Sequence, residues 1–352
     1  ISFERGKDMR NASLYFLSLI FAVLLLFGCS GEKRKVSTSF YYWKTHFELT
    51  DREEAYINSL ETEKLYLRFF DVDWNFNKNI AVPIASIDLG REQLSEYEIV
   101  PTVFITNRTM VQIPYDDVPL LAARIVNRIF QIADSLPIKE IQLDCDWSET
   151  SRDNYFRLLD QIKAQIGEKK IQISSTIRLH QVKYFMITGV PPVDKGMLMF
   201  YNIGDVKDIT TKNSILDLKL AESYLNEFES YPLKLDFALP LFSWGVVMRN
   251  DKTVQLINNL RANQLEDKQK FRFLDPKVIK VLKSTYINGF YLYKGDFIRL
   301  EDVKLTDLKE SAELLAEIDQ ENDVTICFYH LDSPTIEKYS HEELMQICET
   351  FR

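Results

Sequence analysis

The chain has 352 residues and a formal net charge of −9, and outside residues 30–35 it holds no basic block, which argues against nucleic acid as a partner. Its four histidines are scattered without the spacing of metal ligands, so we expect neither a built-in metal site nor another cofactor. Apart from Cys29, the cysteines lie far apart in apolar segments, which predicts buried free thiols at Cys145, Cys327 and Cys348.

Residues 1–28 are predicted to be a secretory signal peptide. Met9 is the expected start, with residues 1–8 not native, and the apolar run Leu14–Phe27 is shorter than the ~20 residues that a membrane-spanning helix needs. The segment Leu26-Phe27-Gly28-Cys29 resembles the lipobox of bacterial lipoproteins, in which the signal is cut before the cysteine and its thiol carries diacylglycerol. The alternative is an uncleaved anchor with an incidental cysteine.

The lipobox resemblance implies that Cys29 anchors the chain to a membrane. Residues 29–36 are short, polar and charged, as a tether between a lipid and a domain should be, and residues 37–352 follow as one barrel domain. Ser30 stands after the cysteine in place of an aspartate. By resemblance to lipoprotein sorting in Gram-negative bacteria, this favours the outer membrane, on its periplasmic or its surface-exposed face.

Beyond the tether, short β-rich runs alternate with amphipathic helical stretches, which is typical of parallel strands joined by helical crossovers. A capping-box pattern opens the first helix at Thr50–Glu53, and apolar residues three and four apart predict another helix at Val118–Ile132. We predict a (β/α)8 TIM-like barrel, with a doubly wound open sheet as the alternative. The expected strands are Ser39–Trp43, Lys64–Asp73, Ile99–Thr106, Glu140–Asp146, Lys170–Thr176, Met197–Asn202, Leu233–Phe242 and Asp323–Tyr329.

A long extra segment follows strand seven. Ser243–Asp302 (residues 243–302) exceeds the length of an ordinary loop and is expected to be a small inserted subdomain. Within it, Asn288–Tyr293 looks like a strand, and a competing count makes that run the eighth barrel strand. We prefer Asp323–Tyr329 as the eighth strand, because a short closing helix at His341–Phe351 ends the chain soon after it.

The ends of strands two and four carry the same motif. In such barrels the site lies at the carboxyl ends of the strands, and both of these strands finish as Asp-x-Asp-Trp. Alternation with period two places Asp71 with Asp73, and Asp144 with Asp146, on one side of its strand. For the inner aspartates, Asp71 and Asp144, we favour a structural role. For the outer aspartates nearer the rim, Asp73 and Asp146, we favour a functional role.

Four carboxylates in one barrel mouth would repel one another. They must therefore be protonated, hydrogen-bonded or paired with Arg68 or Arg178. Such coupling can raise a carboxyl pKa enough for general-acid catalysis.

All four tryptophans fall at predicted strand ends: Trp43, Trp74, Trp147 and Trp244. Aromatic planes beside carboxylates suit sugar rings, whose CH faces stack on them while acids and amides bind the hydroxyls. The alternative for each tryptophan is packing under a loop.

Asp144-Cys145-Asp146-Trp147 looks like the strand-four end of chitinase-like glycoside hydrolases, family eighteen, whose pattern is Asp-x-x-Asp-x-Asp-x-Glu. Met197–Asn202 resembles that family's strand-six Met-x-Tyr segment, and Leu235–Gly245 resembles its strand-seven segment, which an insertion follows. The stretch Ile141–Tyr201 also resembles a group of uncharacterised bacterial TIM-barrel proteins.

The resemblance implies roles for individual residues. The glutamate of the pattern protonates the glycosidic oxygen and the aspartate before it orients an acetamido group, which Tyr201 would help to hold. Here Ser148 stands at the glutamate's position, and Glu149 comes one residue later. On a continuing strand Glu149 would point away from the mouth, and it could reach inward only if the strand ends at Trp147.

Three functions stay open. As a glycosidase, the protein would use Asp144, Asp146, Glu149 and Tyr201 for catalysis and would bind the sugar with Asp71, Asp73, Trp74, Trp147, Arg178 and Trp244. As a binding protein that has lost the acid, it would capture a glycan or cell-wall fragment without cleaving it. A third class, a structural envelope component, would be favoured if the insertion filled the mouth.

Overall fold

The structure, a computed structural model, describes residues 34–90, 94–167, 169–226, 228–318 and 323–352. The predicted signal peptide, Cys29 and most of the predicted tether lie outside these ranges. None of the helices within these ranges has both the length and the apolar character needed to cross a bilayer.

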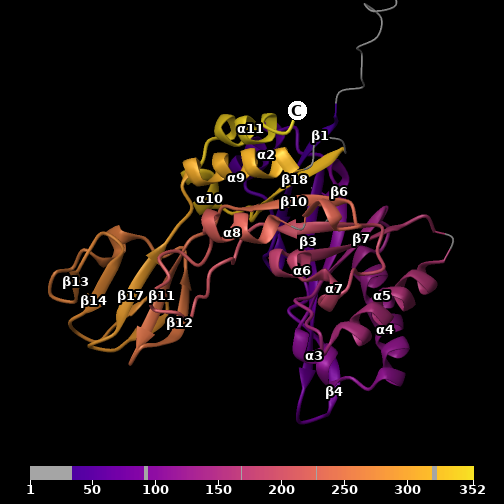
Figure 1. The fold of residues 1–352 in the computed structure, drawn as a ribbon, viewed down its shortest axis with the longest axis horizontal. Coiled ribbons are helices and arrows are strands. Elements are labelled where there is room, and N and C mark those ends of the chain that lie inside the picture. The colour runs from indigo at the N-terminus through magenta and orange to yellow at the C-terminus, as the bar shows by residue number, and fades with distance from the viewer. Residues whose placement is uncertain (1–33, 91–93, 168, 227, 319–322) are drawn as a thin grey trace, which may run out of the picture.

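Eight parallel strands close into a barrel (Figure 1). They follow the order β1, β18, β10, β9, β8, β7, β6 and β3, and β1 also pairs with β3, which completes the ring and excludes an open sheet. The predicted (β/α)8 barrel is thereby confirmed, and the predicted strand ends shift by at most three residues. The strands are β1 Val36–Tyr42, β3 Lys64–Asn75, β6 Glu98–Ile105, β7 Glu140–Asp144, β8 Gln172–Arg178, β9 Lys195–Met199, β10 Leu235–Pro240 and β18 Val324–Tyr329.

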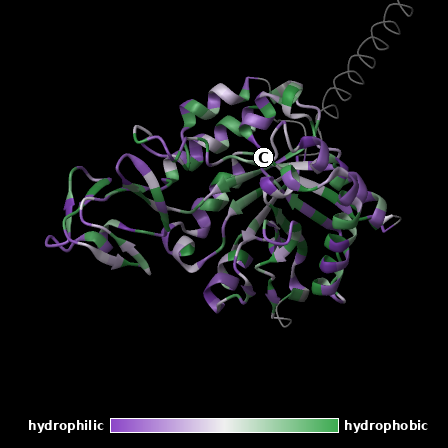
Figure 2. Ribbon diagram, turned by 90° about the horizontal axis from the view of Figure 1, so that it is seen from below, coloured by the Kyte–Doolittle hydropathy of each residue, from purple (hydrophilic) through white to green (hydrophobic). Residues whose placement is uncertain are grey.

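Amphipathic helices cover the outside of the barrel, and apolar residues follow the barrel strands (Figure 2). The first helix begins with the predicted capping box: the Thr50 side chain accepts the N–H of Glu53, and the Glu53 carboxylate accepts the N–H of Thr50. The predicted apolar stripe of α4 is buried against the strands. The helices include α2 Asp51–Ser59, α3 Asn107–Gln112, α4 Val118–Ala133, α5 Arg152–Ile166, α6 Leu179–Lys183, α7 Phe185–Thr188, α8 Leu218–Leu225, α9 Leu305–Ile318, α10 Ser333–Lys338 and α11 His341–Glu349.

An ionic network fills the barrel interior near the amino-terminal ends of its strands. The buried Glu140 carboxylate lies 3.0 Å from the Lys64 ammonium and 3.1 Å from that of Lys195, which also binds Asp236 at 2.8 Å. Burial raises the pKa of Glu140, but the two lysines outweigh it and keep that pKa below its ordinary value. These paired side chains fill the barrel interior at this end.

Strand β3 does not stop at the barrel rim. A register shift between Arg68 and Phe70 reverses which side chains face inward, and the strand then pairs antiparallel with β4, Ile80–Ile84. The resulting hairpin extends past the barrel (Figure 1).

The insertion after β10 forms its own antiparallel sheet, in the order β12-β11-β17-β14-β13, with a separate apolar core around Val247, Ile279 and Ile298. The run Asn288–Tyr293 contributes to a two-stranded hairpin here, so the competing strand count is wrong. The strands are β11 Trp244–Arg249, β12 Lys252–Asn258, β13 Phe271–Phe273, β14 Val278–Val281, β15 Thr285–Ile287, β16 Phe290–Leu292 and β17 Phe297–Glu301.

The three cysteines within the described ranges are buried and free, as predicted: Cys145, Cys327 and Cys348.

Candidate functional site

A cavity of about 510 Å³ opens at the carboxyl ends of the barrel strands, and each of the eight strands, or the residues directly after it, contributes to its wall. The insertion supplies one side through Trp244, Asn258 and Asn259. This is the place where enzymes of this fold bind their substrates. From the barrel the wall includes Trp43, Arg68, Phe104, Asp144, Asp146, Arg178, Tyr201, Asn202, Phe242, Tyr329 and His330.

Aromatic rings form a continuous wall of this cavity. Tyr329, at the end of β18, has ring centroids of Trp43, Tyr201 and Phe242 within 5.2 to 5.7 Å of its own. Phe242 in turn lies 5.2 Å from Trp244, whose indole N–H donates to Glu301 at 2.8 Å. Because each ring is held by its neighbours, the wall presents fixed apolar planes to a ligand.

The polar floor lies at the end of β7. Arg178, at the end of β8, binds the half-exposed Asp146 carboxylate through Nε at 2.5 Å. Asp144 is buried beneath it and accepts the hydroxyl of Thr176 at 2.7 Å. Burial and the neighbouring charge of Asp146 raise the pKa of Asp144 to about 6, while Arg178 opposes the rise. The predicted Asp144, Asp146, Arg178 and Tyr201 therefore lie together, with the Arg178 guanidinium 5.5 Å from the Tyr201 ring.

The two aspartates of β3 lie outside this cavity. After the register shift Asp71 faces Arg68, and the pair is doubly hydrogen-bonded. Asp73 binds Arg108 and accepts the Thr106 hydroxyl at 2.8 Å. These partners, Arg108 first, hold the pKa of Asp73 at about 2 despite partial burial. The carboxylates are paired, as expected from their mutual repulsion. Neither Asp71 nor Asp73 is among the residues that line the cavity, so the structure does not support the expectation that they bind the sugar there.

Two of the four tryptophans do not reach the mouth. Trp147 is 1% exposed, stacks on Tyr155 of α5 at 5.3 Å and donates its indole N–H to the carbonyl of Thr188. Trp74 is 5% exposed and lies outside the cavity wall. The structure therefore places neither predicted sugar contact in the mouth: alternation turns Trp147 to the side opposite Asp146, and Trp74 is buried on the β3–β4 hairpin. Trp244 lines the cavity as expected, and Trp43 does too.

Glu149 is exposed and does not line the cavity. The chain leaves β7 after Asp144, and at Ser148 it enters a polar turn that leads into α5, where the Ser148 N–H donates to the Ser151 hydroxyl at 2.9 Å. The strand therefore ends early, but the turn carries Glu149 towards solvent. This position does not support the prediction that Glu149 serves as the catalytic acid.

Several residues that line the cavity were not predicted from the sequence. Asn202 follows β9, Asn258 and Asn259 come from the end of β12, and His330 follows β18. His330 is nearly buried, which lowers its pKa, and its Nδ1 has no hydrogen-bond partner among the described residues. Its position directly after the last barrel strand was a signal that the carboxyl-end rule could have used.

A smaller cavity of about 260 Å³ adjoins the first and shares Asp146, Arg178, Tyr201 and Asn202 with it. His180 and Tyr224 form its far side. The two cavities meet across the Asp146–Arg178 pair, so the mouth offers room for an extended ligand.

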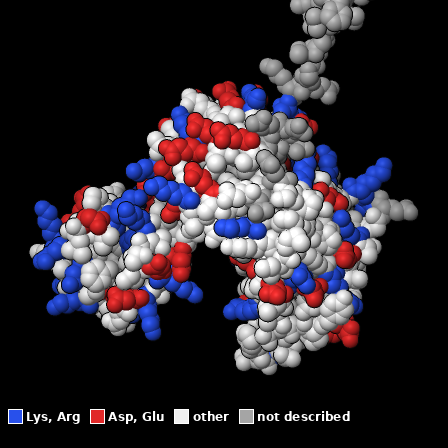
Figure 3. Space-filling model, in the orientation of Figure 1, with Lys and Arg blue, Asp and Glu red and all other residues white. Residues whose placement is uncertain are grey.

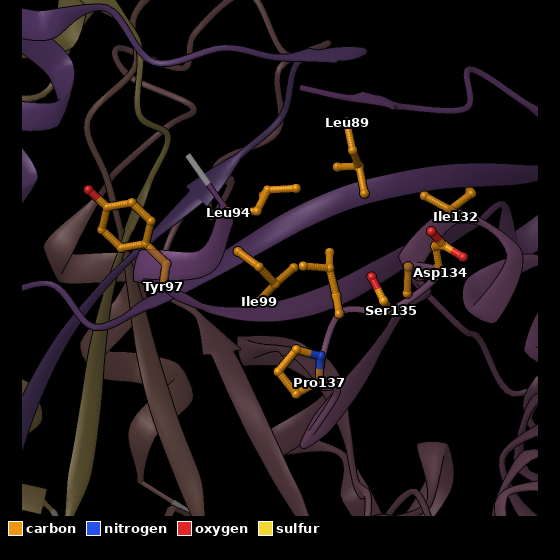
Figure 4. A pocket seen from close by; sticks show the side chains of 10 residues that line it. Leu89, Leu94, Tyr97, Ile99, Ile132, Asp134, Ser135 and Pro137 are labelled. Carbon is orange, nitrogen blue, oxygen red and sulfur yellow. The ribbon is translucent and has the colours of Figure 1, made fainter. Parts of the chain in front are cut away.

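A third cavity, of about 420 Å³, lies at the other end of the barrel, between the start of β6 and the end of α4 (Figure 4). Leu94, Tyr97 and Ile99 face Ile132 and Pro137 across it. Its lining is largely apolar and holds a single acidic side chain among the described residues, so it offers no catalytic arrangement there. No group of three or more His, Cys, Asp or Glu side chains in the described ranges could hold a metal ion.

No family model and no curated protein sequence matches this chain, but solved structures do. The spore cortex-lytic enzyme SleL of Bacillus megaterium QM B1551 superposes with a TM-score of 0.55 at 12% identity, over 92% of this chain and 76% of that chain. The GH18 chitinase ChiB of Flavobacterium johnsoniae gives a TM-score of 0.51 at 12% identity, over 91% and 94%. A chitinase of Chromobacterium violaceum ATCC 12472 gives 0.51 at 10% identity, over 88% and 98%. The fold is therefore chitinase-like.

Proposed function

We propose that this protein binds a glycan at the barrel mouth and holds it without cleaving it. One observation carries the proposal: the mouth joins a fixed wall of five aromatic rings to a polar floor whose two carboxylates already have partners. Sugar rings fit such a wall through their CH faces, and Asp146, Arg178 and the asparagines can bind hydroxyl and amide groups.

Catalysis would need a carboxyl group that can deliver a proton to the glycosidic oxygen. Among the described lining residues only Asp144 and Asp146 carry carboxyl groups, and Asp146 is bound to Arg178. Both oxygens of the Asp146 carboxylate accept hydrogen bonds from Arg178, so this group is engaged by the guanidinium rather than free to face a glycosidic oxygen. The residue at the family's acid position is Ser148, and Glu149 is turned away.

A slow glycosidase is the second candidate, and the raised pKa of Asp144 favours it. A carboxyl group with a pKa of about 6 holds its proton in part of the molecules near neutral pH, and Asp144 lines the cavity. Asp144 would then serve as the general acid. Its hydrogen bond from Thr176 stabilises the ionised form and works against this role.

A structural role in the envelope has less support. The insertion forms one side of the cavity, and about 510 Å³ stays open beside it. A mouth kept open in this way suits a ligand better than a purely structural part.

A glycan array with chitin oligosaccharides and peptidoglycan fragments tests the choice. Wild type should bind at least one of these glycans, and Trp43→Ala should weaken binding about tenfold, since a stacked ring contributes ~1.4 kcal/mol. The matched control is Phe76→Ala, which removes a 64% exposed ring outside the cavity and should leave affinity unchanged. Turnover that Asp144→Asn abolishes would establish the glycosidase, and no binding to any glycan would refute both candidates.

We also propose that the protein is a lipoprotein, anchored through Cys29 and placed on the outer membrane. The support is the lipobox-like segment before Cys29 and the polar tether after it. Cys29→Ser should release the protein from membranes or stall its processing, as fractionation of cells that express each form can measure. Membrane retention equal to that of wild type would refute the anchor.

A further inference from the structure

The insertion differs in charge from the remaining chain. Residues 243–302 hold 11 Lys and Arg against 7 Asp and Glu, a net charge of +4, while the whole chain has −9. Figure 3 shows Lys and Arg over the visible face of the insertion. This segregation points to an anionic partner for the insertion, because charges on a surface attract a partner of opposite sign.

Three exposed tyrosines form a row on the hairpin β15–β16 of this insertion. Tyr286 and Tyr291 face each other across the two strands, with ring centroids 4.8 Å apart, and Tyr293 lies 4.8 Å further along. Their exposed fractions are 68%, 43% and 51%. The opposite face of the hairpin buries Leu292 and partly buries Ile287 in the core of the insertion. Alternation therefore gives the hairpin one packed face and one face of tyrosines.

A buried carboxylate fixes the end of the tyrosine row. Asp296 is 1% exposed and accepts two hydrogen bonds from Arg249, at 2.7 and 2.8 Å, and the N–H of Tyr293 at 2.8 Å. The Arg249 guanidinium thereby lies 4.1 Å from the centroid of the Tyr293 ring. Ring and cation are ordered before a ligand arrives, which lowers the entropy that binding would cost.

Two lysines flank the same end of the hairpin. The N–H of Lys294 donates to the Ser284 hydroxyl at 2.9 Å, which brings Lys294 beside the backbone next to Lys283. Both lysines are exposed, and neither has an ion pair with another described residue. They are therefore available to carboxylates of a ligand.

We propose that the tyrosine row, with Lys283 and Lys294, is a second glycan site that binds an acidic polysaccharide. The proposal rests on the proposed glycan-binding function and extends it. Tyrosine rings stack on sugar rings, while the lysines pair with the carboxylates of uronic acid units. A duplex nucleic acid or an anionic membrane would bring its dense charge against the acidic barrel as well, whereas a single polysaccharide chain can follow the insertion alone.

The hairpin is also tied to the barrel mouth. Asn288 at its turn accepts a hydrogen bond from Gln264 at 3.0 Å, and Gln264 follows Asn259 of the cavity wall by five residues. At ~3.8 Å per residue, the Cα atoms of Asn259 and Gln264 lie within about 19 Å of each other. One polysaccharide chain can therefore occupy the mouth and the insertion together, which would raise its overall affinity.

The test compares polygalacturonate with its methyl ester, which has the same backbone without the charges. Wild type should bind polygalacturonate at least tenfold more tightly, with an affinity that falls as salt rises. Lys283→Glu with Lys294→Glu should remove this preference, and Tyr291→Ala should weaken binding to both polymers severalfold. The matched control, Lys78→Glu with Lys219→Glu, makes the same charge change at exposed lysines of the barrel and should keep the preference.

Binding of chitin tetrasaccharide, measured in parallel, separates this site from the mouth. It should be equal in wild type and in the insertion variants. If wild type binds polygalacturonate but no chitin oligosaccharide or peptidoglycan fragment, the proposed mouth function fails and the insertion site stands. Equal affinity for the two polymers would overturn the insertion site. The insertion site would also be overturned if wild type bound duplex DNA or phosphatidylglycerol vesicles more tightly than polygalacturonate and the double lysine variant abolished that binding.

Discussion

The ends of β3 and β7 carry the same Asp-x-Asp-Trp motif, but only the aspartates of the β7 end line the cavity. On β7, which ends at the barrel rim, Asp144 and Asp146 form the floor of the cavity beside Arg178. On β3, which continues into a hairpin with β4, Asp71 is bound by Arg68 and Asp73 by Arg108, and neither carboxylate lines the cavity. The motif thus fixes which side chains point inward, but the length and register of the strand decide whether they reach the mouth.

The largest expected effect concerns the tryptophan of β7. Trp147→Ala should lower the free energy of unfolding by about 3 to 5 kcal/mol, because the indole is buried against Tyr155 and its removal leaves a large cavity. Urea unfolding followed by circular dichroism measures the loss. The glycan affinity of the folded variant should equal that of wild type. A tenfold loss of affinity with unchanged stability would instead put Trp147 in the mouth.

The pKa values of Asp144 on β7 and Asp73 on β3 are shifted in opposite directions, so the two carboxyl groups should give opposite dependences of stability on pH. The pKa of Asp144 is raised to about 6 in the folded state, so wild type loses stability as the pH rises from about 4 to 6. Asp144→Asn does not titrate, and its stability relative to wild type should therefore improve by up to about 3 kcal/mol between pH 4 and pH 7. Urea unfolding of both proteins at these two pH values measures the change.

Asp73 is the counterpart on β3, since its pKa is lowered to about 2. Its contribution to stability is present above pH 4 and is lost as the pH falls towards 2. Asp73→Asn should therefore be less stable than wild type at pH 7 and match it near pH 2. If the stability gaps of the two variants changed with pH in the same direction, the contrast between the strand ends would be wrong.

A smaller effect is expected on binding. Asp146→Asn should weaken glycan affinity about tenfold, which corresponds to ~1.4 kcal/mol, because it removes a charged acceptor from the cavity floor. Asp73→Asn makes the same chemical change outside the cavity and should leave affinity within twofold. Isothermal titration calorimetry with a bound oligosaccharide can compare the two. Equal losses in both variants would place the β3 end in the site after all.

The smallest effect is expected from Arg108→Ala. Without the guanidinium, the pKa of Asp73 should rise from about 2 towards its ordinary value, because Arg108 is the main cause of the lowering. Carbon-13 NMR of the aspartate carboxyl groups can follow this titration. Glycan affinity should not change, since Arg108 does not line the cavity.

The barrel could be predicted from the sequence because its signals are local. Alternating strand and helix patterns, the capping box at Thr50 and the apolar stripe of α4 each follow from residues close together in the chain. The sequence also predicted which side chains meet at the mouth, because strand ends meet at one face of a closed barrel. These are Asp144, Asp146, Arg178 and Tyr201.

The rest of the site depends on geometry that these patterns do not encode. The register shift after Arg68 sets Asp71 against that arginine, and it arises from pairing between strands distant in sequence. Asn259 reaches the mouth only because the inserted sheet lies against the barrel rim. Trp147 could have been assigned correctly, since period-two alternation already opposes it to Asp146.

The central claim is that the mouth holds a glycan and leaves it intact. It is tested most directly by calorimetric titration of wild type and Trp43→Ala with whichever chitin oligosaccharide or peptidoglycan fragment binds tightest, followed by mass spectrometry of the recovered ligand. We expect one site per chain, about tenfold weaker binding in the variant, and a ligand of unchanged mass after prolonged incubation. Shorter saccharides in the recovered ligand, or equal affinity in both proteins, would contradict it.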